Sequence, residues 1–142
     1  MIWKAYRDLY RQLSDALQAQ LARDSGLSAP EYAVLVELSY EPEAVMRARD
    51  LCAALSWDRS RLSHLVGRME KRRLVTREEC AEDARGSMIR LTKAGRAAVD
   101  DAAPEHSDAI RRYFFDQLSG AELDTLHTVF ERLLANLDRQ QS

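Results

Sequence analysis

The chain has 142 residues, of which 46% are hydrophobic and 31% are charged, a composition typical of one folded domain rather than of a disordered chain. No apolar run is long enough to span a bilayer, and the amphipathic N-terminus lacks a small-residue cleavage site, so neither a membrane anchor nor a signal peptide is expected. Two cysteines, Cys52 and Cys80, do not make a disulfide framework. These features favour a cytoplasmic protein with reduced thiols.

The net charge of −2 conceals a separation of charge along the chain. Residues 47–96 carry 13 Lys and Arg against 7 Asp and Glu, whereas the remainder carries 8 against 16. A basic segment in an otherwise acidic protein predicts a face that binds a polyanion.

Residues 2–23 predict one amphipathic helix, because apolar side chains recur every three or four residues. The stripe consists of Trp3, Tyr6, Leu9, Tyr10, Leu13, Leu17 and Leu21. Such a helix is about 30 Å long, too long for one small core to cover, so part of the stripe is expected to meet a second chain. Gly26 ends the helix, and Ser28 with Glu31 predicts a capping box for the next one.

A helix-turn-helix is expected from a short helix at 48–55, a turn at 56–58 and a longer helix that Asp58 caps. The core-facing residues of the longer helix recur at intervals of three, four and seven: Leu62, Leu65, Val66 and Met69. Its free faces carry polar and basic residues: Arg59, Ser60, Ser63, His64, Gly67 and Arg68.

A β-hairpin is expected at 76–91, with TREE (76–79) and MIRL (88–91) as its strands. The segment between them, CAEDARGS, is rich in turn-forming residues and places Asp83 and Gly86 at the tip. A hairpin directly after a helix-turn-helix is a wing.

Thr92 is expected to cap a helix that Pro104 bends or breaks. The last helix begins with a second capping box, Ser119 with Glu122, and its apolar stripe is covered by nothing later in the chain. The stripe comprises Leu123, Leu126, Val129, Phe130, Leu133, Leu134 and Leu137. We interpret the first, fifth and sixth helices as a dimerisation layer, the alternative being that they pack only against one another within the chain.

One pattern extends from the helix-turn-helix through the wing. It comprises Leu51-Cys52-Ala53-Ala54-Leu55, Ser60-Arg61-Leu62-Ser63, Val66, Arg68-Met69-Glu70, Leu74-Val75, Arg77, Asp83-Ala84-Arg85-Gly86 and Leu91-Thr92-Lys93-Ala94-Gly95. The DxRG…LT-x-x-G signature after a helix-turn-helix is specific, and essentially the whole chain resembles the MarR family of winged-helix transcriptional regulators. The resemblance implies a homodimeric repressor or activator, often relieved by a small phenolic or other amphipathic ligand. Arg73 departs from the family pattern, which usually has glycine before Leu-Val.

The expected fold is therefore mainly α with a small β-wing, in a single domain of residues 1–142. Residues 28–92 form a winged helix-turn-helix DNA-binding lobe, and residues 93–104 form a connecting helix. The N- and C-terminal helices, residues 2–23 and 105–140, supply the dimerisation layer.

Candidate DNA contacts lie in the helix-turn-helix and the wing. The major-groove candidates are Arg59, Ser60, Arg61, Ser63, His64 and Arg68, because arginine suits guanine, while serine and a helix N-terminus suit phosphate. Arg77 is expected near a phosphate. Arg85 is long enough to enter the minor groove, and Asp83 pairs with it and aims it; the resemblance implies the same roles. The alternatives are a solvated helix face and an ordinary surface ion pair.

The expected partners are double-stranded DNA, as a pseudo-palindromic operator with half-sites about 10 bp apart, and a second copy of the chain. No cofactor, metal site or enzymatic activity is expected, because the sequence has no P-loop, GxGxxG, HExxH, GxSxG or CxxC motif. Two alternatives remain open: a winged-helix protein-interaction module without DNA binding, and a redox-responsive regulator that uses Cys80. Cys52 is interpreted as a core residue and Trp57 as a packing residue.

A ligand is expected between the helical layer and the winged-helix lobe, where it would shift the spacing of the two recognition helices. The aromatic residues that could line its pocket, or equally be plain core, are Tyr6, Tyr10, Tyr32, Tyr40, Tyr113 and Phe114.

Overall fold

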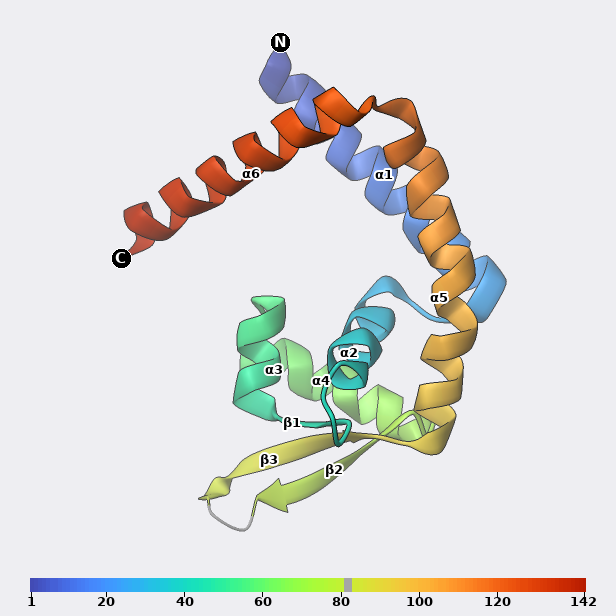
Figure 1. Cartoon of the computed structure of the whole chain (residues 1–142). Coiled ribbons are helices and arrows are strands. Elements are labelled where there is room, and N and C mark those ends of the chain that lie inside the picture. Colours follow the sequence, from blue (N-terminus) through green and yellow to red (C-terminus); the bar gives the residue numbers. More distant parts are fainter. Residues whose placement is uncertain (81–82) are drawn as a thin grey trace. The chain divides into compact units, whose positions relative to one another are not determined.

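Figure 1 shows the computed structural model of the chain, which describes residues 1–80 and 83–142, with the side chains of residues 80–85 outside the description. Its elements are α1 (Ile2–Ser25), α2 (Ala29–Ser39), β1 (Val45–Arg47), α3 (Ala48–Leu55), α4 (Arg59–Lys71), β2 (Val75–Cys80), β3 (Asp83–Leu91), α5 (Lys93–Tyr113), the 3-10 helix η1 (Phe115–Gln117) and α6 (Gly120–Gln141). The chain forms two compact units, Met1–His106 and Ser107–Ser142. The predicted fold class, mainly helical with a small β-wing, is confirmed.

Side-chain caps fix where several helices begin, as the sequence predicts. The Ser28 hydroxyl accepts a hydrogen bond from the Glu31 N–H at 3.2 Å, and the Glu31 carboxylate accepts one from the Ser28 N–H at 3.0 Å. The same reciprocal capping box, formed by Ser119 and Glu122, starts α6. The Asp58 carboxylate accepts a backbone N–H at the start of α4 at 2.8 Å. These bonds satisfy N–H groups that the first turn of a helix leaves without partners.

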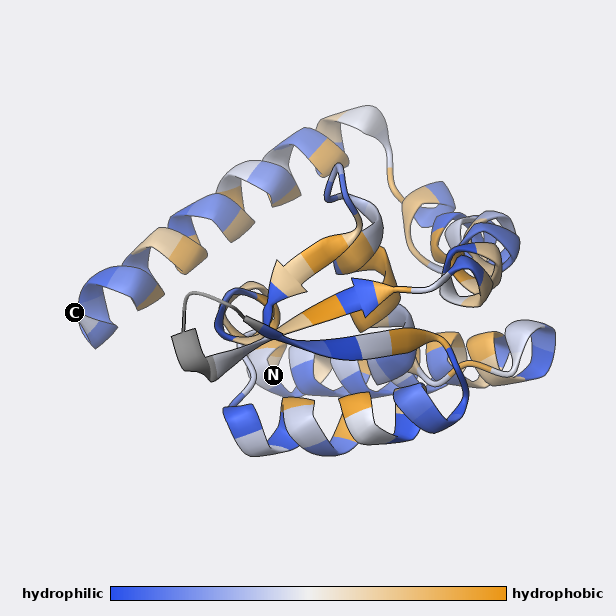
Figure 2. Ribbon diagram, turned by 90° about the horizontal axis from the view of Figure 1, so that it is seen from below, coloured by the Kyte–Doolittle hydropathy of each residue, from blue (hydrophilic) through white to orange (hydrophobic). Residues whose placement is uncertain are grey.

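The hydrophobic core of the first unit joins α2, α3, α4, the sheet and the first half of α5. Its most buried members include Val34, Leu35, Leu38, Leu51, Leu62, Leu65, Val66, Met69, Val75, Ile89 and Val99. The four residues expected on the buried face of α4 are all among them. Cys52 is also buried, at 8% exposure, which confirms its interpretation as a core residue. Figure 2 shows hydrophobic residues along the sheet and the helices beside it.

The sheet has three antiparallel strands in the order β1-β3-β2, one more than the sequence predicts. β1 pairs with the base of β3, with Met46 opposite Ile89. The wing strands are also longer than expected, since Cys80 pairs with Asp83 and Gly86 lies within β3. Asp83 and Gly86 are therefore strand residues. The predicted eight-residue turn between TREE and MIRL is wrong, because the pairing of β2 with β3 extends past Met88 to Ser87 and Asp83.

Gly95 and Thr92 join the wing to α5, which gives a physical reason for the LT-x-x-G signature. The Thr92 hydroxyl accepts a hydrogen bond from the Gly95 N–H at 2.9 Å, and the Thr92 N–H donates to the Leu74 carbonyl at 3.1 Å. A Cβ on Gly95 would lie 2.1 Å from the Leu74 carbonyl oxygen. Only glycine therefore allows α5 to start this close to the chain that enters β2.

α5 is one continuous helix with Pro104 inside it, so of the two effects expected of this proline, a bend or a break, the break is excluded. Proline lacks an N–H and removes one bond of the helical ladder, but the helix continues on both sides of it. The segment expected as a connecting helix and the residues after Pro104 are thus parts of one element.

Two helices expose long apolar faces. In α1 only Gln20 and Leu21 are buried, and the exposed apolar residues are Ile2, Trp3, Tyr6, Leu9 and Tyr10. In α6 the large exposed ones are Phe130, Leu133, Leu134 and Leu137. No helix in the described part of the chain is long and apolar enough to cross a membrane.

Candidate DNA-binding surface

The free surface of α4 divides into three rows because the helix turns once every 3.6 residues. Opposite the buried face lies an outermost row of Ser60, His64, Gly67 and Lys71. The row on the wing side holds Arg59, Ser63 and Glu70, and the row on the other side holds Arg61, Arg68 and Arg72. The sequence prediction omitted Lys71, although its spacing from Ser60, His64 and Gly67 is a signal that could have found it.

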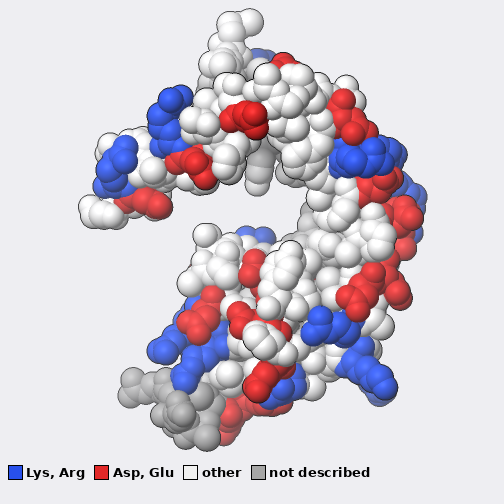
Figure 3. All heavy atoms as spheres, in the orientation of Figure 1, with Lys and Arg blue, Asp and Glu red and all other residues white. Residues whose placement is uncertain are grey.

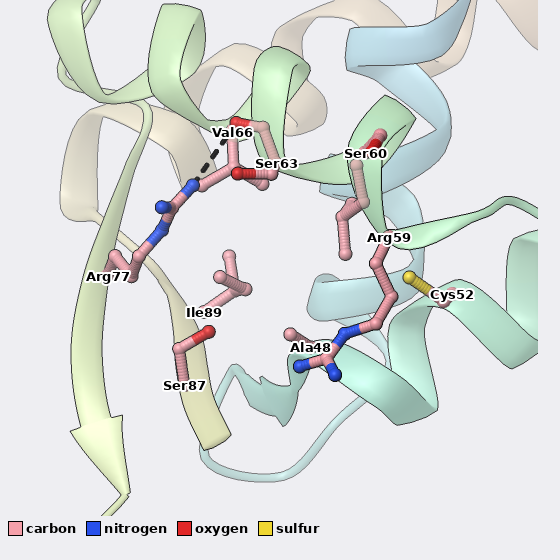
Figure 4. A pocket seen from close by; sticks show the side chains of 10 residues that line it. Ala48, Cys52, Arg59, Ser60, Ser63, Val66, Arg77, Ser87 and Ile89 are labelled. Atoms are coloured by element: carbon pink, nitrogen blue, oxygen red, sulfur yellow. Dashed lines mark hydrogen bonds between the residues drawn. The ribbon is translucent and has the colours of Figure 1, made fainter. Parts of the chain in front are cut away.

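A cavity of about 300 Å³ lies between α4 and the wing. Arg59 and Arg77 line it from opposite sides, and Ile89 lies between them, as Figure 4 shows. Ser60, Ser63 and Ser87 add hydroxyl groups to the lining. Two cations and three hydroxyls around a shallow cavity suit an anionic oxygen.

Arg77 connects the wing to α4. Its guanidinium donates a hydrogen bond to the Ser63 carbonyl oxygen at 3.2 Å, drawn in Figure 4, and its Nε lies 3.9 Å from the Glu70 carboxylate. The Arg77 backbone N–H also donates to Glu70 at 3.3 Å. Glu70 is a second residue that the sequence prediction missed, and its part is to hold β2 against α4.

Cys52 lines the same cavity from α3, and its thiol lies 3.8 Å from the Asp58 carbonyl oxygen. Burial raises the pKa of the Cys52 thiol, while the nearby Arg59 cation partly opposes that effect. The thiol therefore stays protonated at neutral pH, which makes it a poor nucleophile.

Arg61 does not extend straight out from α4. Its guanidinium carbon lies 4.3 Å from the centre of the Trp57 ring, a cation–π contact that couples the recognition helix to the preceding turn. Trp57 itself packs against the hydrophobic core, as the sequence predicts.

Arg72 binds the start of α2. Its guanidinium donates to both carboxylate oxygens of Glu31 at 2.7 Å and 2.6 Å, and to the Gly26 carbonyl at 3.3 Å. Burial alone would raise the pKa of Glu31, but the Ser28 N–H and the Arg72 cation outweigh it, so the pKa lies below its ordinary value. The pair links residues 41 positions apart, and the local sequence pattern carries no sign of it.

Asp83 and Arg85, the predicted minor-groove pair, have side chains that lie outside the described residues, as does the side chain of Cys80. The backbone shows a register shift: Glu79 pairs with Ser87, and Cys80 pairs with Asp83. Residues 84–86 therefore form an insertion in β3, with Arg85 at its centre. Bulges of this kind change the direction in which a strand presents its residues.

Basic side chains gather near α3 and β1 on the face of the lobe shown in Figure 3.

Closer to the core of the wing, Arg90 pairs with Glu78 at 2.7 Å, and the Arg90 guanidinium lowers the pKa of the Glu78 carboxyl. Among the described residues, no group of three or more His, Cys, Asp and Glu is placed to hold a metal ion.

A second cavity, of about 450 Å³, lies between α1, α2 and the start of α4. Its lining comprises Tyr10, Ser14, Leu17, Gln18, Leu21, Ala29, Pro30, Tyr32, Ala33, Trp57, Arg61 and His106. The His106 ring packs edge-on against Tyr32 with centres 4.7 Å apart, and its Nδ1 lies 2.8 Å from the Gln20 amide oxygen. Because that oxygen only accepts, Nδ1 carries the proton, and burial lowers the pKa of His106.

Comparison with known proteins places the chain among transcriptional regulators. A model described as MarR family matches residues 25–86. AbsC, a MarR family transcriptional regulator from Streptomyces coelicolor, is 34% identical, with a TM-score of 0.91 over 96% of this chain and 92% of AbsC. Sco3205, a MarR family regulator from the same organism solved in complex with DNA, is 35% identical, with a TM-score of 0.91 over 96% of this chain and 86% of that one. The transcriptional regulator HosA from Escherichia coli is 28% identical over 128 residues, or 90% of each chain.

The winged helix-turn-helix, the basic surface around α4 and these similarities agree with one another. The chain belongs to the MarR family of transcriptional regulators, which are winged-helix DNA-binding proteins and not enzymes.

Proposed function

We propose that this protein is a cytoplasmic, homodimeric, sequence-specific repressor in which each α4 enters a major groove and each wing enters the flanking minor groove. The observation that carries the proposal is the outermost row of α4, which is polar, basic at its end and free of packing contacts with the core. A helix that shows such a row at the surface fits the major groove of B-DNA.

The contacts are divided among the rows of α4. Ser60, His64 and Lys71 of the outermost row reach base edges or the phosphates beside them. Arg59, Ser63 and Arg77 surround the cavity between α4 and the wing, where a backbone phosphate fits their cations and hydroxyl groups. Arg61 and Arg68 contact the backbone from the other side, since phosphate contacts set the position of a helix in the groove.

The wing supplies the minor-groove contact. Arg85 lies at the centre of the β3 insertion, beyond the regular pairing of the sheet. An arginine presented there is drawn to the negative potential of a narrow A·T-rich groove, and Asp83 restrains it.

Dimerisation is supported by the exposed apolar faces of α1 and α6. Trp3 is 66% exposed and Leu134 is 62% exposed, and each belongs to a stripe of similar residues. Stripes of this length on two helices are typical of surfaces that a second chain covers. A two-fold dimer then matches an operator whose half-sites lie about 10 bp apart.

Ligand control is supported by the cavity of about 450 Å³, which falls within the size range of small-molecule sites. Two of the six aromatic residues predicted for the pocket, Tyr10 and Tyr32, line it, and Trp57 adds a third ring. A flat amphipathic molecule that binds there relieves repression by favouring an arrangement of the lobe with lower DNA affinity.

In vitro selection from a pool of random duplexes tests the proposal. We expect enrichment of inverted repeats, and we expect His64→Ala to lower affinity for the selected site by about tenfold, since one base contact is worth about 1–3 kcal/mol. Arg132→Ala, on the exposed surface of α6, serves as the control and is expected to bind as the wild type does. Selection that enriches no sequence would overturn the proposal.

A further inference from the structure

The end of the recognition helix is tied to the corner where α1 ends and α2 begins. Arg72, the C-cap of α4, donates hydrogen bonds to both carboxylate oxygens of Glu31 at 2.7 Å and 2.6 Å and to the Gly26 carbonyl oxygen at 3.3 Å. Glu31 lies in the first turn of α2, and Gly26 is the C-cap of α1. One guanidinium therefore joins three helices, in a contact of Arg72, Glu31 and Gly26 that we call the corner clamp.

The carboxylate and the carbonyl that Arg72 binds are both held in place. Glu31 is 7% exposed, and its carboxylate also accepts the Ser28 N–H at 3.0 Å, so it has little freedom to rotate. Gly26 has a φ of 72°, and its N–H donates to the Ala22 carbonyl at 3.1 Å. An arginine–carboxylate pair with two bonds fixes the angle between its partners as well as their distance.

The corner clamp lies between the helix proposed to enter DNA and a helix proposed to form the dimer. The first half of α1 exposes Trp3, Tyr6 and Tyr10, whereas Leu21, near its end, is buried. In a two-fold dimer the distance between the two recognition helices depends on the angle that each α4 makes with its dimer helix. A contact that fixes this angle therefore bears on the spacing of half-sites that the dimer accepts.

We propose that Arg72 is a positioning residue for operator recognition, and that through Glu31 and Gly26 it holds α4 at the angle that matches one half-site spacing. This inference rests on the proposed function and adds to it the contact that makes the dimer discriminate between spacings. One base pair added between the half-sites moves them apart by about 3.4 Å. Without the corner clamp α4 can tilt, so that operators with altered spacing bind with a smaller penalty.

The test uses the operator obtained by in vitro selection and two altered duplexes, in which one base pair is inserted or removed midway between the half-sites. Fluorescence anisotropy gives the spacing ratio, which is the affinity for the operator divided by the affinity for an altered duplex. We expect Arg72→Gln to lower the spacing ratio by about fivefold, a typical size for a change in an element that couples two sites.

Further variants of the same contact test whether the pair acts as a unit. Glu31→Gln keeps a residue suited to the capping box and is also expected to lower the spacing ratio. Arg72→Lys keeps the charge but not the planar fork, so an intermediate ratio is expected. The double variant, Glu31→Gln with Arg72→Gln, is expected to match Arg72→Gln alone, because both changes remove one contact. Glu31→Gln and Arg72→Lys carry the test if Arg72→Gln does not fold.

Two controls separate positioning from other roles. Arg68→Gln, one turn earlier on the same side of α4, removes a proposed phosphate contact. It is expected to weaken binding to all three duplexes by the same factor and to reduce the salt dependence of binding, which Arg72→Gln leaves unchanged. Val99→Ala lowers stability within the core and is expected to keep the wild-type spacing ratio, because it leaves the corner clamp intact.

The possible outcomes distinguish this inference from the function on which it rests. A wild-type spacing ratio in Arg72→Gln, or an equal loss on all three duplexes with a weaker salt dependence, overturns the positioning role of Arg72. Selection of inverted repeats with no fixed spacing by the wild type also overturns it. Selection that enriches no sequence would instead overturn the proposed function.

Discussion

Single residues at the end of α4 show how this chain holds an unusual backbone. Arg73 has a φ of 63°, in the left-handed region that costs an L-residue about 1 kcal/mol. The Arg73 N–H donates a hydrogen bond to the Glu70 carbonyl at 2.9 Å, and the Leu74 N–H donates one to the Met69 carbonyl at 3.0 Å. Arg73 thus stands at a position where the family pattern has glycine and where glycine would relieve backbone strain.

Arg73→Gly is expected to stabilise the protein by up to about 0.5 kcal/mol, because the strain relieved exceeds the entropy that glycine loses on folding. Urea unfolding followed by circular dichroism measures the difference. Lys71→Gly is the control, because Lys71 lies within α4 and has an ordinary helical backbone. It is expected to destabilise the protein by about 1 kcal/mol. If both changes destabilise equally, the left-handed backbone carries no strain.

The contribution of Glu31 to the free energy of unfolding depends on pH. Its pKa is lowered in the folded state, so its contribution is fully present above the unfolded pKa and is lost as the pH falls through the folded one. Glu31→Gln is therefore expected to destabilise the protein by about 1–2 kcal/mol at neutral pH and by less below about pH 4. Urea midpoints at the two pH values measure this. The control is Glu37→Gln on the same helix. If Glu31→Gln lowers the free energy of unfolding as much at low pH as at neutral pH, the ion pair between Glu31 and Arg72 does not stabilise the protein.

At the scale of elements, the wing and α4 are joined by Arg77, Ser63 and Glu70 rather than by apolar packing alone. These contacts keep the direction of the wing fixed relative to α4. The two elements can therefore meet adjacent grooves of one duplex as a unit.

Arg85→Ala is expected to weaken operator binding about tenfold while leaving dimerisation intact, because the change removes the arginine proposed for the minor groove and lies in the wing. Fluorescence anisotropy measures the affinity, and light scattering measures the dimer. Arg90→Ala, which removes a paired cation on the same strand, is the control and is expected to have a smaller effect. Equal affinities of wild type and R85A would show that the wing does not engage DNA.

Local features of the sequence predicted the capped helix starts and the buried face of α4, because a cap or a helical stripe involves residues a few positions apart. β1 was missed because its three residues become a strand only by pairing with β3, some 40 positions later. For the same reason no pattern revealed that Arg72 binds Glu31. Arg61 was predicted as a DNA contact from its place on α4, but its stacking on Trp57 depends on side-chain directions that spacing does not give.

At the scale of the whole molecule, the account requires two copies of the chain. The apolar faces of α1 and α6 are left exposed by the single chain, whereas the winged-helix lobe has a closed core of its own. The proposed dimer is therefore expected to depend on the terminal helices more than on the lobe.

Removing the residues after Leu118 is expected to abolish the dimer, since α6 and its stripe are then absent. Size exclusion with light scattering measures the mass. Leu134→Asp with Leu137→Asp in the full chain tests the same surface without deletion and is expected to give a monomer whose circular dichroism stays helical. Arg132→Asp, on another side of α6, is expected to remain dimeric; a dimer in the doubly substituted chain would place the interface elsewhere.

The most direct test of the account is the salt dependence of binding to the selected operator. Several phosphate contacts in each subunit predict that the logarithm of the affinity falls with the logarithm of salt concentration with a slope of magnitude about 4 or more. Arg59→Gln is expected to lower that magnitude by about 1 for each phosphate that the arginine no longer neutralises. A slope near zero would contradict DNA binding through the basic surface of α4 and the wing, and would favour a winged helix that contacts protein instead.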